Sequence, residues 1–337
     1  EGRGVLDGNV EICTGRGMVG AGEARGNSEE GGDEERGRKE SLGDVLGRLE
    51  PGFLDDPVQR WMTSAFTEFD NGAAIDRLSA EFFDEDSVFP GEDVILTGGY
   101  DQVLAPLAEG VDVRFGARVR SVRLLEEEGA EVTTSKGAFQ AMYVVCTCPL
   151  GILKQGDVAF DPPLPESHTG AIGRMGFGNV TKIALKFAAP FWPVETQYLG
   201  LVTEPPGRWN YFLNYRTFTD QNILVGLSVG DYPLVAEAMS DSEMVADAMQ
   251  VLRDAYGDDI PDPVAFRTTR WSRDPNALGA YSFVQVGSSP DDWETLAEPV
   301  DGTLLFAGEH AYWDYKGTTH GALFSGRAAA RWIIDDA

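Results

Sequence analysis

Residues suited to chemistry cluster near the C-terminal end of the chain. Residues 303–307 are a short apolar run bounded by glycines, which predicts a buried strand, and Glu309 follows where open α/β sheets present ligand groups. Thr318 and Thr319 can cap a helix that the pattern predicts over about 320–334. Small residues on its first turns would let a flat ligand approach a helix end that carries partial positive charge. The stretch could hold such a ligand beside a carboxylate that binds a polyol, although strand–loop–helix units without a ligand are equally common.

Lys182 lies in a long stretch, 176–188, that predicts a strand. Period-2 alternation places Val180, Lys182, Ala184 and Lys186 on one face. This pattern alone favours a lysine that faces solvent.

Trp271 and Tyr281 are two aromatic residues within the segment 270–283. An aromatic wall can hold an amine in place and interact with it through its π face. Isolated Trp and Tyr residues more often belong to an ordinary hydrophobic core, so the pattern alone leaves both interpretations open.

The spacing of the histidines and serines disfavours metal and hydrolase chemistry. The three histidines, His168, His310 and His320, have no metal-ligand spacing. No Gly-x-Ser-x-Gly turn and no Ser-His-Asp order occurs in the sequence.

Several motifs together point to one family. Gly308-Glu309-His310 is followed at 317–326 by Gly-Thr-Thr-His-Gly-Ala-Leu-Phe-Ser-Gly, and residues 176–183 read Gly-Phe-Gly-Asn-Val-Thr-Lys-Ile. Gly-Gly-Tyr at 98–100 and Tyr-Val-Val-Cys-Thr-Cys-Pro-Leu-Gly at 143–151 add to the pattern. These motifs resemble the flavin-containing amine oxidase family, which includes the polyamine oxidases and the flavin-dependent histone lysine demethylases. The resemblance covers roughly residues 58–337.

The resemblance implies a role for each candidate residue. Lys182 would hold a water against N5 of the flavin, where a cation favours oxygen reduction, and Tyr281 would form the substrate wall. A reduced flavin carries negative charge on one edge, which the helix N-terminus would stabilise. The residues that the resemblance implies for FAD binding are Val119, Trp271, Gly308, Glu309, Thr318 and Thr319.

The resemblance also implies an α/β (α+β) fold. An FAD-binding Rossmann-like domain, incomplete in this chain, would be joined to a substrate domain built on a mixed or antiparallel sheet flanked by helices. The expected division is a flexible acidic glycine-rich segment at 1–45, substrate-domain helices at 46–92, part of the FAD-binding domain at 93–150, the substrate-binding domain at 151–285 and the C-terminal part of the FAD-binding domain at 286–337.

A formal match to the dinucleotide-binding pattern Gly-x-Gly-x-x-Gly occurs at 15–20, Gly-Arg-Gly-Met-Val-Gly. Asp7, Asn9 and Glu11 precede it and suit a buried parallel strand poorly, and no apolar helix follows. Because the pattern needs both elements, we do not expect a phosphate-binding loop here. We expect the family's first βαβ unit to be absent, which would weaken the hold of the chain on FAD.

Hydrophobic periodicity predicts the remaining elements. They are helices over 58–69, 73–80, 100–108 and 241–256, the last capped by Asp241, strands over 93–96, 111–115, 209–215 and 223–229, and antiparallel hairpins over 110–148.

Composition sets limits on partners and class. The 337 residues allow one large or two medium domains, and a hydrophobic content of 42% is a globular value. The net charge of −28 disfavours nucleic acid as a direct partner and favours cationic substrates, although it can equally serve solubility. Cys146 and Cys148 read as small core residues, and Cys13 leaves no even disulfide set. No membrane span or secretory segment is visible, and the compartment stays unassigned, with a soluble one favoured.

These observations favour an FAD-dependent amine oxidase of the polyamine-oxidase type. A hydride would pass from the carbon beside a neutral amine to flavin N5, the imine would be hydrolysed, and O₂ would be reduced to H₂O₂. One alternative is a histone-demethylase-like enzyme, because Thr318 stands where many polyamine oxidases have an aromatic residue and the demethylases have threonine. The other alternative is a non-catalytic remnant, which the expected loss of the first βαβ unit supports.

Overall fold

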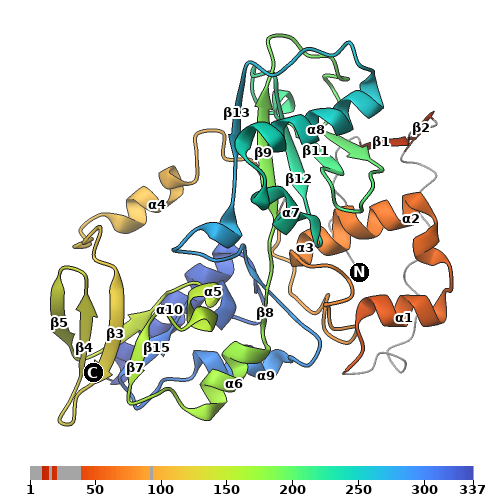
Figure 1. The fold of residues 1–337 in the computed structure, drawn as a ribbon. Coiled ribbons are helices and arrows are strands. Elements are labelled where there is room, and N and C mark those ends of the chain that lie inside the picture. The colour runs from red at the N-terminus through yellow and green to blue at the C-terminus, as the bar shows by residue number, and fades with distance from the viewer. Residues whose placement is uncertain (1–9, 15–16, 21–38, 92–93, 337) are drawn as a thin grey trace.

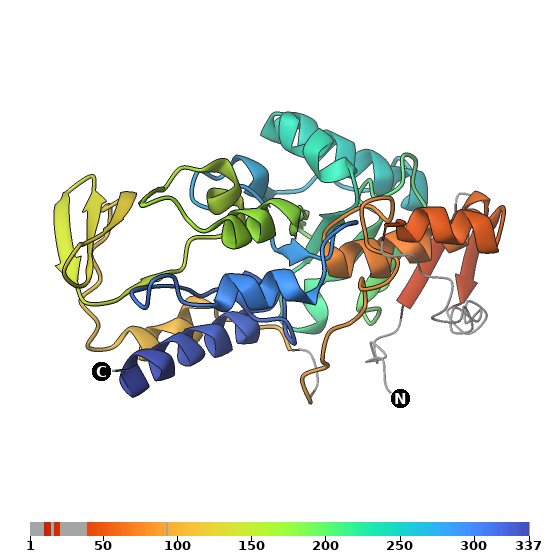
Figure 2. The same cartoon turned by 90° about the horizontal axis from the view of Figure 1, so that it is seen from below.

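The computed structural model describes residues 10–14, 17–20, 39–91 and 94–336, which form a mixed α/β fold with four β-sheets. Figures 1 and 2 show two parts side by side. One part surrounds a seven-stranded sheet, and the other combines the smaller sheets with the C-terminal helix α10 (Thr319–Asp336). The mixed α/β class expected from the sequence is confirmed.

The seven-stranded sheet has the order β13-β9-β12-β11-β10-β1-β2, antiparallel throughout except between β1 and β10. Along β9 the side chains alternate, so that Ile183 and Leu185 are fully buried while Lys182 and Lys186 are exposed. The buried face packs against apolar residues of α8, including Met244 and Leu252. The strands are β1 (Val10–Thr14), β2 (Gly17–Gly20), β9 (Thr181–Lys186), β10 (Tyr198–Leu201), β11 (Tyr211–Asn214), β12 (Ile223–Ser228) and β13 (Ala265–Thr268), with helices α7 (Tyr232–Ala238) and α8 (Asp241–Tyr256) beside them.

The second part contains a short parallel pair and a four-stranded sheet of order β5-β4-β3-β7. Strand β15 (Leu304–Phe306) pairs in parallel with β6 (Val144–Cys146), and all its residues are buried, which confirms the strand predicted over 303–307. Of the antiparallel hairpins predicted over 110–148, those over residues 119–141 are confirmed, whereas β6 pairs in parallel. The other elements are β3 (Val119–Leu124), β4 (Ala130–Thr134), β5 (Gly137–Ala141), β7 (Ala159–Asp161), β8 (Gly176–Phe177), β14 (Ser282–Phe283), α4 (Asp101–Ala108), α5 (Leu150–Gln155), α6 (Glu166–Arg174) and α9 (Pro290–Ala297).

A helix predicted over 58–69 is present and runs without interruption through α2 (Pro57–Met62), a π-helical segment (Thr63–Glu68) and α3 (Phe69–Asn71). Asp56 caps it, since its carboxylate accepts hydrogen bonds from the N–H groups of residues 58 and 59, both at 2.9 Å. The helix ends at Gly72, whose φ of +65° suits a residue without a Cβ. Single π-helical turns inside α-helices are frequent at functional sites.

Three predicted elements are wrong. Residues 73–80 are not a helix, because their backbone groups pair with other segments: Leu42 N–H donates to Leu78 O at 3.0 Å, and Ser79 N–H donates to Val284 O at 2.9 Å. Residues 94–96 and 111–115 form no strand, since they have no partner strand among the described elements, and residue 93 lies outside them.

Two helix boundaries agree closely with the sequence. Helix α8 has the predicted bounds, but its cap is Ser240 and not Asp241, because Ser240 and Glu243 form a reciprocal capping box. Helix α4 lies within the predicted 100–108.

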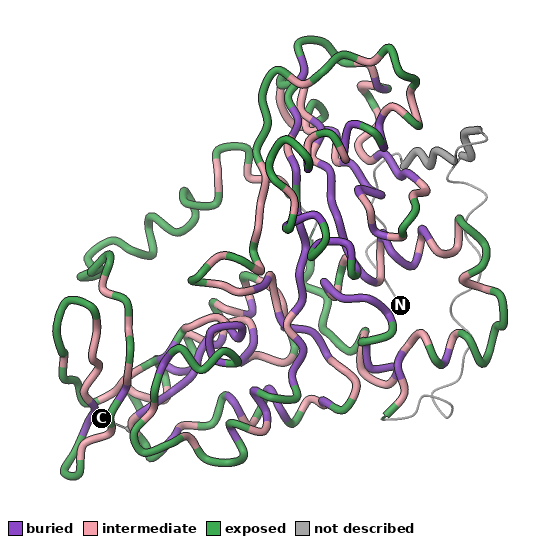
Figure 3. Tube along the Cα trace, in the orientation of Figure 1, coloured by how far each residue is buried: buried purple, intermediate pink, exposed green. Residues whose placement is uncertain are grey.

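Helix α4 and the segment after it consist largely of exposed residues, coloured green in Figure 3, and several of these residues are apolar. Phe115 is the most exposed of these residues, at 82%. Exposed apolar runs of this length are unusual on soluble proteins, so this surface is unlike the rest of the molecule. Its large apolar residues are Tyr100, Val103, Leu104, Leu107, Val111, Val113 and Phe115.

The N-terminal glycine pattern does not start a helix. Gly17–Gly20 is strand β2, paired antiparallel with β1, which agrees with the expectation that no phosphate-binding loop lies here. Residues 1–9, 15–16 and 21–38 lie outside the described residues, and with them most of the segment expected to be flexible. The described parts differ from that expectation, since residues 42–45 belong to α1 (Leu42–Leu49).

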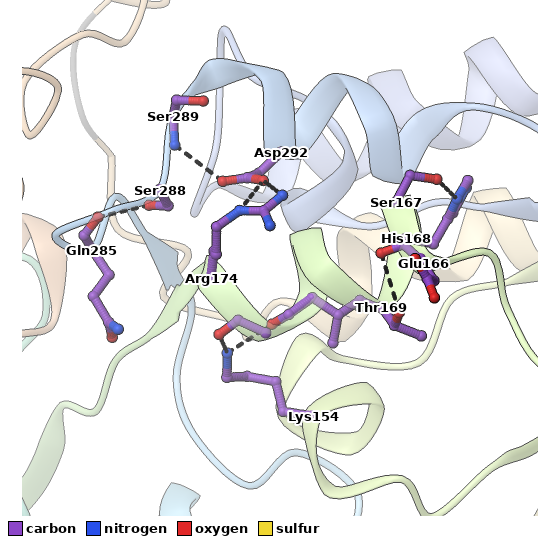
Figure 4. Close-up of polar contacts among 12 residues, drawn as sticks. Lys154, Glu166, Ser167, His168, Thr169, Arg174, Gln285, Ser288, Ser289 and Asp292 are labelled. Atoms are coloured by element: carbon purple, nitrogen blue, oxygen red, sulfur yellow. Dashed lines mark hydrogen bonds and ion pairs between the residues drawn. The ribbon is translucent and has the colours of Figure 1, made fainter. Parts of the chain in front are cut away.

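The joint between α5, α6 and α9 is held by charged side chains, shown in Figure 4. The Lys154 ammonium donates to the carbonyls of Ile172, Gly173 and Met175 at 2.7 to 3.0 Å, at the C-terminal end of α6. Arg174 donates twice to Asp292 of α9, at 2.9 and 2.6 Å. Cations at a helix C-terminus satisfy its last carbonyls and complement the helix dipole.

We expect Lys154→Met to lower the free energy of unfolding by about 1–2 kcal/mol, because three carbonyls lose a charged donor while remaining partly hydrated. Urea unfolding followed by circular dichroism would measure this. Lys136→Met is the matched control, since the Lys136 ammonium donates to a single exposed carbonyl, that of Phe115 at 2.6 Å, and its loss should cost less than about 0.5 kcal/mol. Equal losses in the two variants would contradict the capping role of Lys154.

Candidate active site

Lys182 lies at the start of β9 with its side chain on the exposed face. Its backbone is fixed by Thr269, whose hydroxyl accepts from Lys182 N–H at 2.8 Å and whose N–H donates to Lys182 O at 3.0 Å. No hydrogen bond or ion pair to its ammonium occurs within the described ranges. The side chain reaches solvent, yet desolvation by the surrounding protein lowers the pKa of Lys182. An unpaired ammonium with a lowered pKa can bind a water or a developing anion.

Tyr281 connects two segments that are distant in the sequence. Its hydroxyl donates to the carbonyl of Phe69 at the end of the long helix. A Cβ at Gly72 would lie 2.9 Å from the Tyr281 ring, and one at Gly317 would lie 3.5 Å from it. Burial, followed by the charges of Asp70 and Glu309, raises the pKa of Tyr281. The ring therefore stands neutral between the helix 57–71 and the loop before α10.

Other tyrosines lie near Tyr281. Tyr198 and Tyr211 stack with their ring centroids 5.3 Å apart, and Phe69 approaches Tyr211 at 6.2 Å. Tyr281 packs against the same hydrophobic cluster. The charge of Asp70 also contributes to the raised pKa of Tyr211, after burial and Tyr198. One carboxylate therefore acts on two tyrosine hydroxyls in this cluster.

Glu309 follows β15 and is buried among backbone donors. Its carboxylate accepts from Ser282 N–H at 3.1 Å, from the Ser282 hydroxyl at 2.5 Å and from Gly317 N–H at 2.8 Å. Burial raises the pKa of Glu309, and these hydrogen bonds partly offset that effect. The carboxylate thus joins β14 to the loop before α10. Because Oε1 accepts only one of these bonds, it keeps a lone pair for the polyol contact predicted from the sequence.

The start of α10 is capped as predicted. The Thr318 hydroxyl accepts from Gly321 N–H at 3.0 Å and donates to Tyr315 O at 2.7 Å, and Thr319 is the first helical residue. A Cβ at Gly321 would lie 2.1 Å from Tyr315 O, so only glycine allows this close approach. The predicted capping role belongs to Thr318.

Gly308 ends the buried strand next to α10. The Ser325 hydroxyl donates to Gly308 O at 2.8 Å and accepts from Gly308 N–H at 2.9 Å. The adjacent His310 is 2% exposed, its Nε2 has no partner, and burial lowers its pKa to about 4. At this pKa the imidazole is neutral near pH 7, and it lies beside Glu309 with one ring nitrogen unused.

Trp271 and Val119 are less closely joined to the rest. Trp271 opens a short 3₁₀ turn, Trp271–Arg273, and is 42% exposed. Val119 begins β3 opposite Thr134, in the four-stranded sheet, and packs against a different hydrophobic cluster from that of Tyr281. The structure therefore links Tyr281 and Glu309 to the loop of Thr318 through Gly317, whose N–H donates to Glu309 and which lies against the Tyr281 ring.

Two residues of the site were not identified from the sequence: Asp70 and Ser282. Each is a common polar residue in a stretch whose pattern suggests an ordinary helix or loop. Only the approach of distant segments reveals them, so no sequence signal marked them.

The residues present fit the ring side of a flavin. Glu309 Oε1 and His310 Nε2 have unused capacity for hydrogen bonds near the N-terminus of α10, while the glycines at 308, 317 and 321 allow close packing of the surrounding loop. The described part of the chain contains no glycine-rich strand–turn–helix for a pyrophosphate. We therefore expect these residues to contact the ring and ribityl side of such a site.

Comparison with known proteins identifies the family of the chain. The family model described as flavin containing amine oxidoreductase matches residues 23–334. Lysine-specific histone demethylase 1 homolog 1 of Arabidopsis thaliana is 36% identical over 307 residues, which is 87% of this chain and 36% of the relative. The rice relative of the same name, from Oryza sativa subsp. japonica, is 36% identical over 79% of this chain and 32% of its own length. The chain therefore spans about a third of the length of these relatives.

A solved structure of putrescine oxidase with bound putrescine is also similar, with a TM-score of 0.75 over 97% of this chain and 81% of the other. At 19% identity this likeness concerns the fold, which is that of an FAD-binding amine oxidase. No helix among the described residues is long and apolar enough to cross a membrane, and none of their side chains form a metal-binding cluster. The family match over residues 23–334 and the relatives at 36% identity show that the chain belongs to the flavin-containing amine oxidoreductase family.

Proposed function

We propose that this chain is the catalytic part of an FAD-dependent oxidase that removes an N-alkyl group from a cationic amine, with N-methyl-lysine in a peptide as the favoured substrate. FAD is the cofactor of the family. One observation carries the proposal: Tyr281 joins the helix 57–71 to the loop of Glu309 and Thr318, while the Lys182 ammonium has no partner among the residues that the structure describes. The names of the relatives at 34–36% identity support the choice of N-methyl-lysine.

The chemistry divides between the cofactor and the chain. When bound, FAD takes a hydride from the carbon beside the amine nitrogen and returns the electrons to O₂. Tyr281 and its neighbouring tyrosines would exclude water and hold the neutral amine. Lys182 would hold a water that attacks the oxidised amine, or stabilise negative charge near it. The N-terminal end of α10, together with Glu309, would orient the cofactor.

Charge favours a cationic substrate. The chain carries a net charge of −28, which raises the local concentration of cations and their rate of encounter. Asp70 is exposed beside Phe69 and acts on the tyrosine cluster. A carboxylate there would attract the positively charged remainder of the substrate, while the reacting nitrogen is neutral.

A polyamine is the second candidate substrate. The similar solved structure is described as putrescine oxidase bound to putrescine, and a polyamine also presents several cationic amines. Thr318 does not decide between the two, since it lies in the cap of α10 with its hydroxyl bound to Tyr315 O.

The proposal is tested by the visible spectrum of the purified chain after incubation with FAD and removal of the excess. We expect retained flavin bands that bleach anaerobically with a dimethyl-lysine peptide, and less with spermine at equal concentration. Bleaching by spermine alone would favour the polyamine candidate. A protein that keeps FAD but is bleached by neither amine, or one that keeps no FAD, would contradict the proposed activity of this chain and favour the non-catalytic alternative.

A further inference from the structure

Glu237 is a fully buried carboxylate in α7. Its Oε1 accepts from the Asn179 amide at 3.0 Å and from the Thr181 hydroxyl at 2.8 Å. Its Oε2 accepts from Ser272 N–H at 3.1 Å and from the Ser272 hydroxyl. Four donors thus converge on one side chain.

These donors belong to the segments that carry the proposed catalytic residues. Thr181 directly precedes Lys182 on β9, and Ser272 directly follows Trp271. The carboxylate therefore joins the strand of the lysine to the turn of the tryptophan. Glu237 lies 56 residues after Thr181 and 35 residues before Ser272 in the sequence.

The third segment is reached through Asn179. Its N–H donates to Gly72 O at 2.8 Å, and Gly72 lies against the Tyr281 ring. The preceding residue, Gly178, exchanges backbone hydrogen bonds with this segment: its N–H donates to Tyr281 O at 2.7 Å, and its carbonyl accepts from Ala280 N–H at 2.8 Å. Glu237 thereby fixes the segment that pairs with Tyr281.

The electrostatic setting of Glu237 is unusual. A buried carboxylate is costly unless it is paired or fully hydrogen-bonded. In the part of the chain that the structure describes, no Lys, Arg or His forms an ion pair with Glu237, so hydrogen bonds from neutral groups alone compensate it. Apolar side chains in its place could hold α7 with a smaller desolvation penalty. The buried carboxylate therefore indicates a role beyond stability.

We infer that Glu237 is a positioning residue whose hydrogen bonds, and not its charge, hold the segments of Lys182, Trp271 and Tyr281 in one fixed arrangement. The inference rests on the proposed function for the roles of those three residues. Glu237 itself touches neither substrate nor cofactor.

Two substitutions separate position from charge. Glu237→Gln keeps the shape: its Oε1 can accept from Ser272, and its amide can donate to Asn179 Oδ1, which is buried without a partner, once the Asn179 carboxamide turns over. The Thr181 hydroxyl can rotate to accept as well. Glu237→Met has a similar volume but accepts none of the four hydrogen bonds.

Amide hydrogen exchange gives a readout that needs no cofactor. We expect Glu237→Met to speed exchange at residues 179–183 and 270–274 by about tenfold or more, and Glu237→Gln to change it little. With FAD bound, Glu237→Met should lower kcat per flavin by about 10- to 100-fold while KM stays within about threefold, because misplacement of catalytic groups acts on turnover. Glu237→Gln should keep most of kcat.

Asp247→Asn is the matched control. Asp247 accepts from Arg208, Trp209 and Tyr232 at 2.7 to 3.0 Å, but joins none of the three catalytic segments. We expect it to lower stability without changing kcat per flavin. If Glu237→Met does not fold, Ser272→Ala replaces it, with faster exchange expected only near 270–274.

Two outcomes would overturn the inference. The first is a folded Glu237→Met variant, or Ser272→Ala in its place, with the exchange pattern and kcat of the wild type. The second is a Glu237→Gln variant as impaired as Glu237→Met, which would assign the role to the charge. A wild-type chain that oxidises no amine would remove the proposed function, while the exchange data would still decide whether Glu237 orders these segments.

Discussion

Lys182→Met should slow the reaction of the reduced enzyme with oxygen by about 10²- to 10³-fold, the usual cost of losing one preorganised charged donor. The reason lies in the surroundings of the ammonium. It has no ion-pair partner among the described residues, and its backbone is fixed by two hydrogen bonds to Thr269. Methionine keeps the length of the side chain and removes only the charge and the donors. Anaerobic reduction by the amine should change less than about threefold, since the proposed role concerns the water and oxygen.

Stopped-flow spectroscopy of the two half-reactions would measure these effects separately. Lys186→Met is the matched control, because Lys186 lies on the same exposed face of β9 and its ammonium is bound to Gln221 at 2.7 Å. It should leave both half-reactions unchanged. Unchanged reoxidation in Lys182→Met would remove Lys182 from the mechanism.

The pH dependence adds a second signature. Desolvation lowers the pKa of Lys182 below the free lysine value of 10.5, and the protonated form is the one expected to assist. The rate of reoxidation should therefore fall as the pH rises through that lowered pKa, on the acidic side of 10.5. This limb of the pH profile should be absent in Lys182→Met.

The sequence predicted the elements whose signal is local. The strand over 303–307 and the cap at Thr318 were confirmed, because an apolar run between glycines and a hydroxyl before a helix act within a few residues. Helix α8 agreed at both ends for the same reason. Its cap at Ser240, one residue earlier than predicted, shows the usual limit of such boundaries.

Long-range contacts explain the failures. Residues 73–80 have helical composition, but their backbone pairs with residues 40–43 and 284 instead. Residues 111–115 read as a strand, yet a strand needs a neighbour, and the described elements offer none. No sequence pattern marked Glu237, since its donors come from segments 35 to 58 residues away. The choice between N-methyl-lysine and polyamine depends on the shape of the site and was likewise beyond the sequence pattern.

Glu309→Leu should lower the free energy of unfolding by roughly 3 kcal/mol or more and abolish stable FAD binding. Leucine leaves Ser282 N–H, the Ser282 hydroxyl and Gly317 N–H without an acceptor, and each unsatisfied buried group costs about 1–3 kcal/mol. The loop between Gly317 and α10 would lose its link to β14, and with it the fixed start of the helix that we propose to lie against the cofactor. Urea unfolding and FAD titration by fluorescence would measure the two effects.

Glu309→Gln gives a separate test through pH. Because burial raises the pKa of Glu309 in the folded chain, the fold favours the protonated acid, and this contribution is full below the unfolded value of about 4.5. It is lost as the pH rises through the raised pKa, at about 1.4 kcal/mol for each unit of the shift. Glutamine is neutral at every pH, so the stability of Glu309→Gln should gain on that of the wild type across this window, whereas the exposed control Glu294→Gln should show no such trend. The contrary outcome is a wild-type chain whose stability changes with pH in parallel with that of Glu309→Gln from pH 4 to 8. It would mean that the carboxylate ionises at no cost to stability.

In that case the hydrogen bonds from Ser282 and Gly317, and not burial, would determine the pKa of Glu309. The carboxylate would then face the cofactor as a full negative charge.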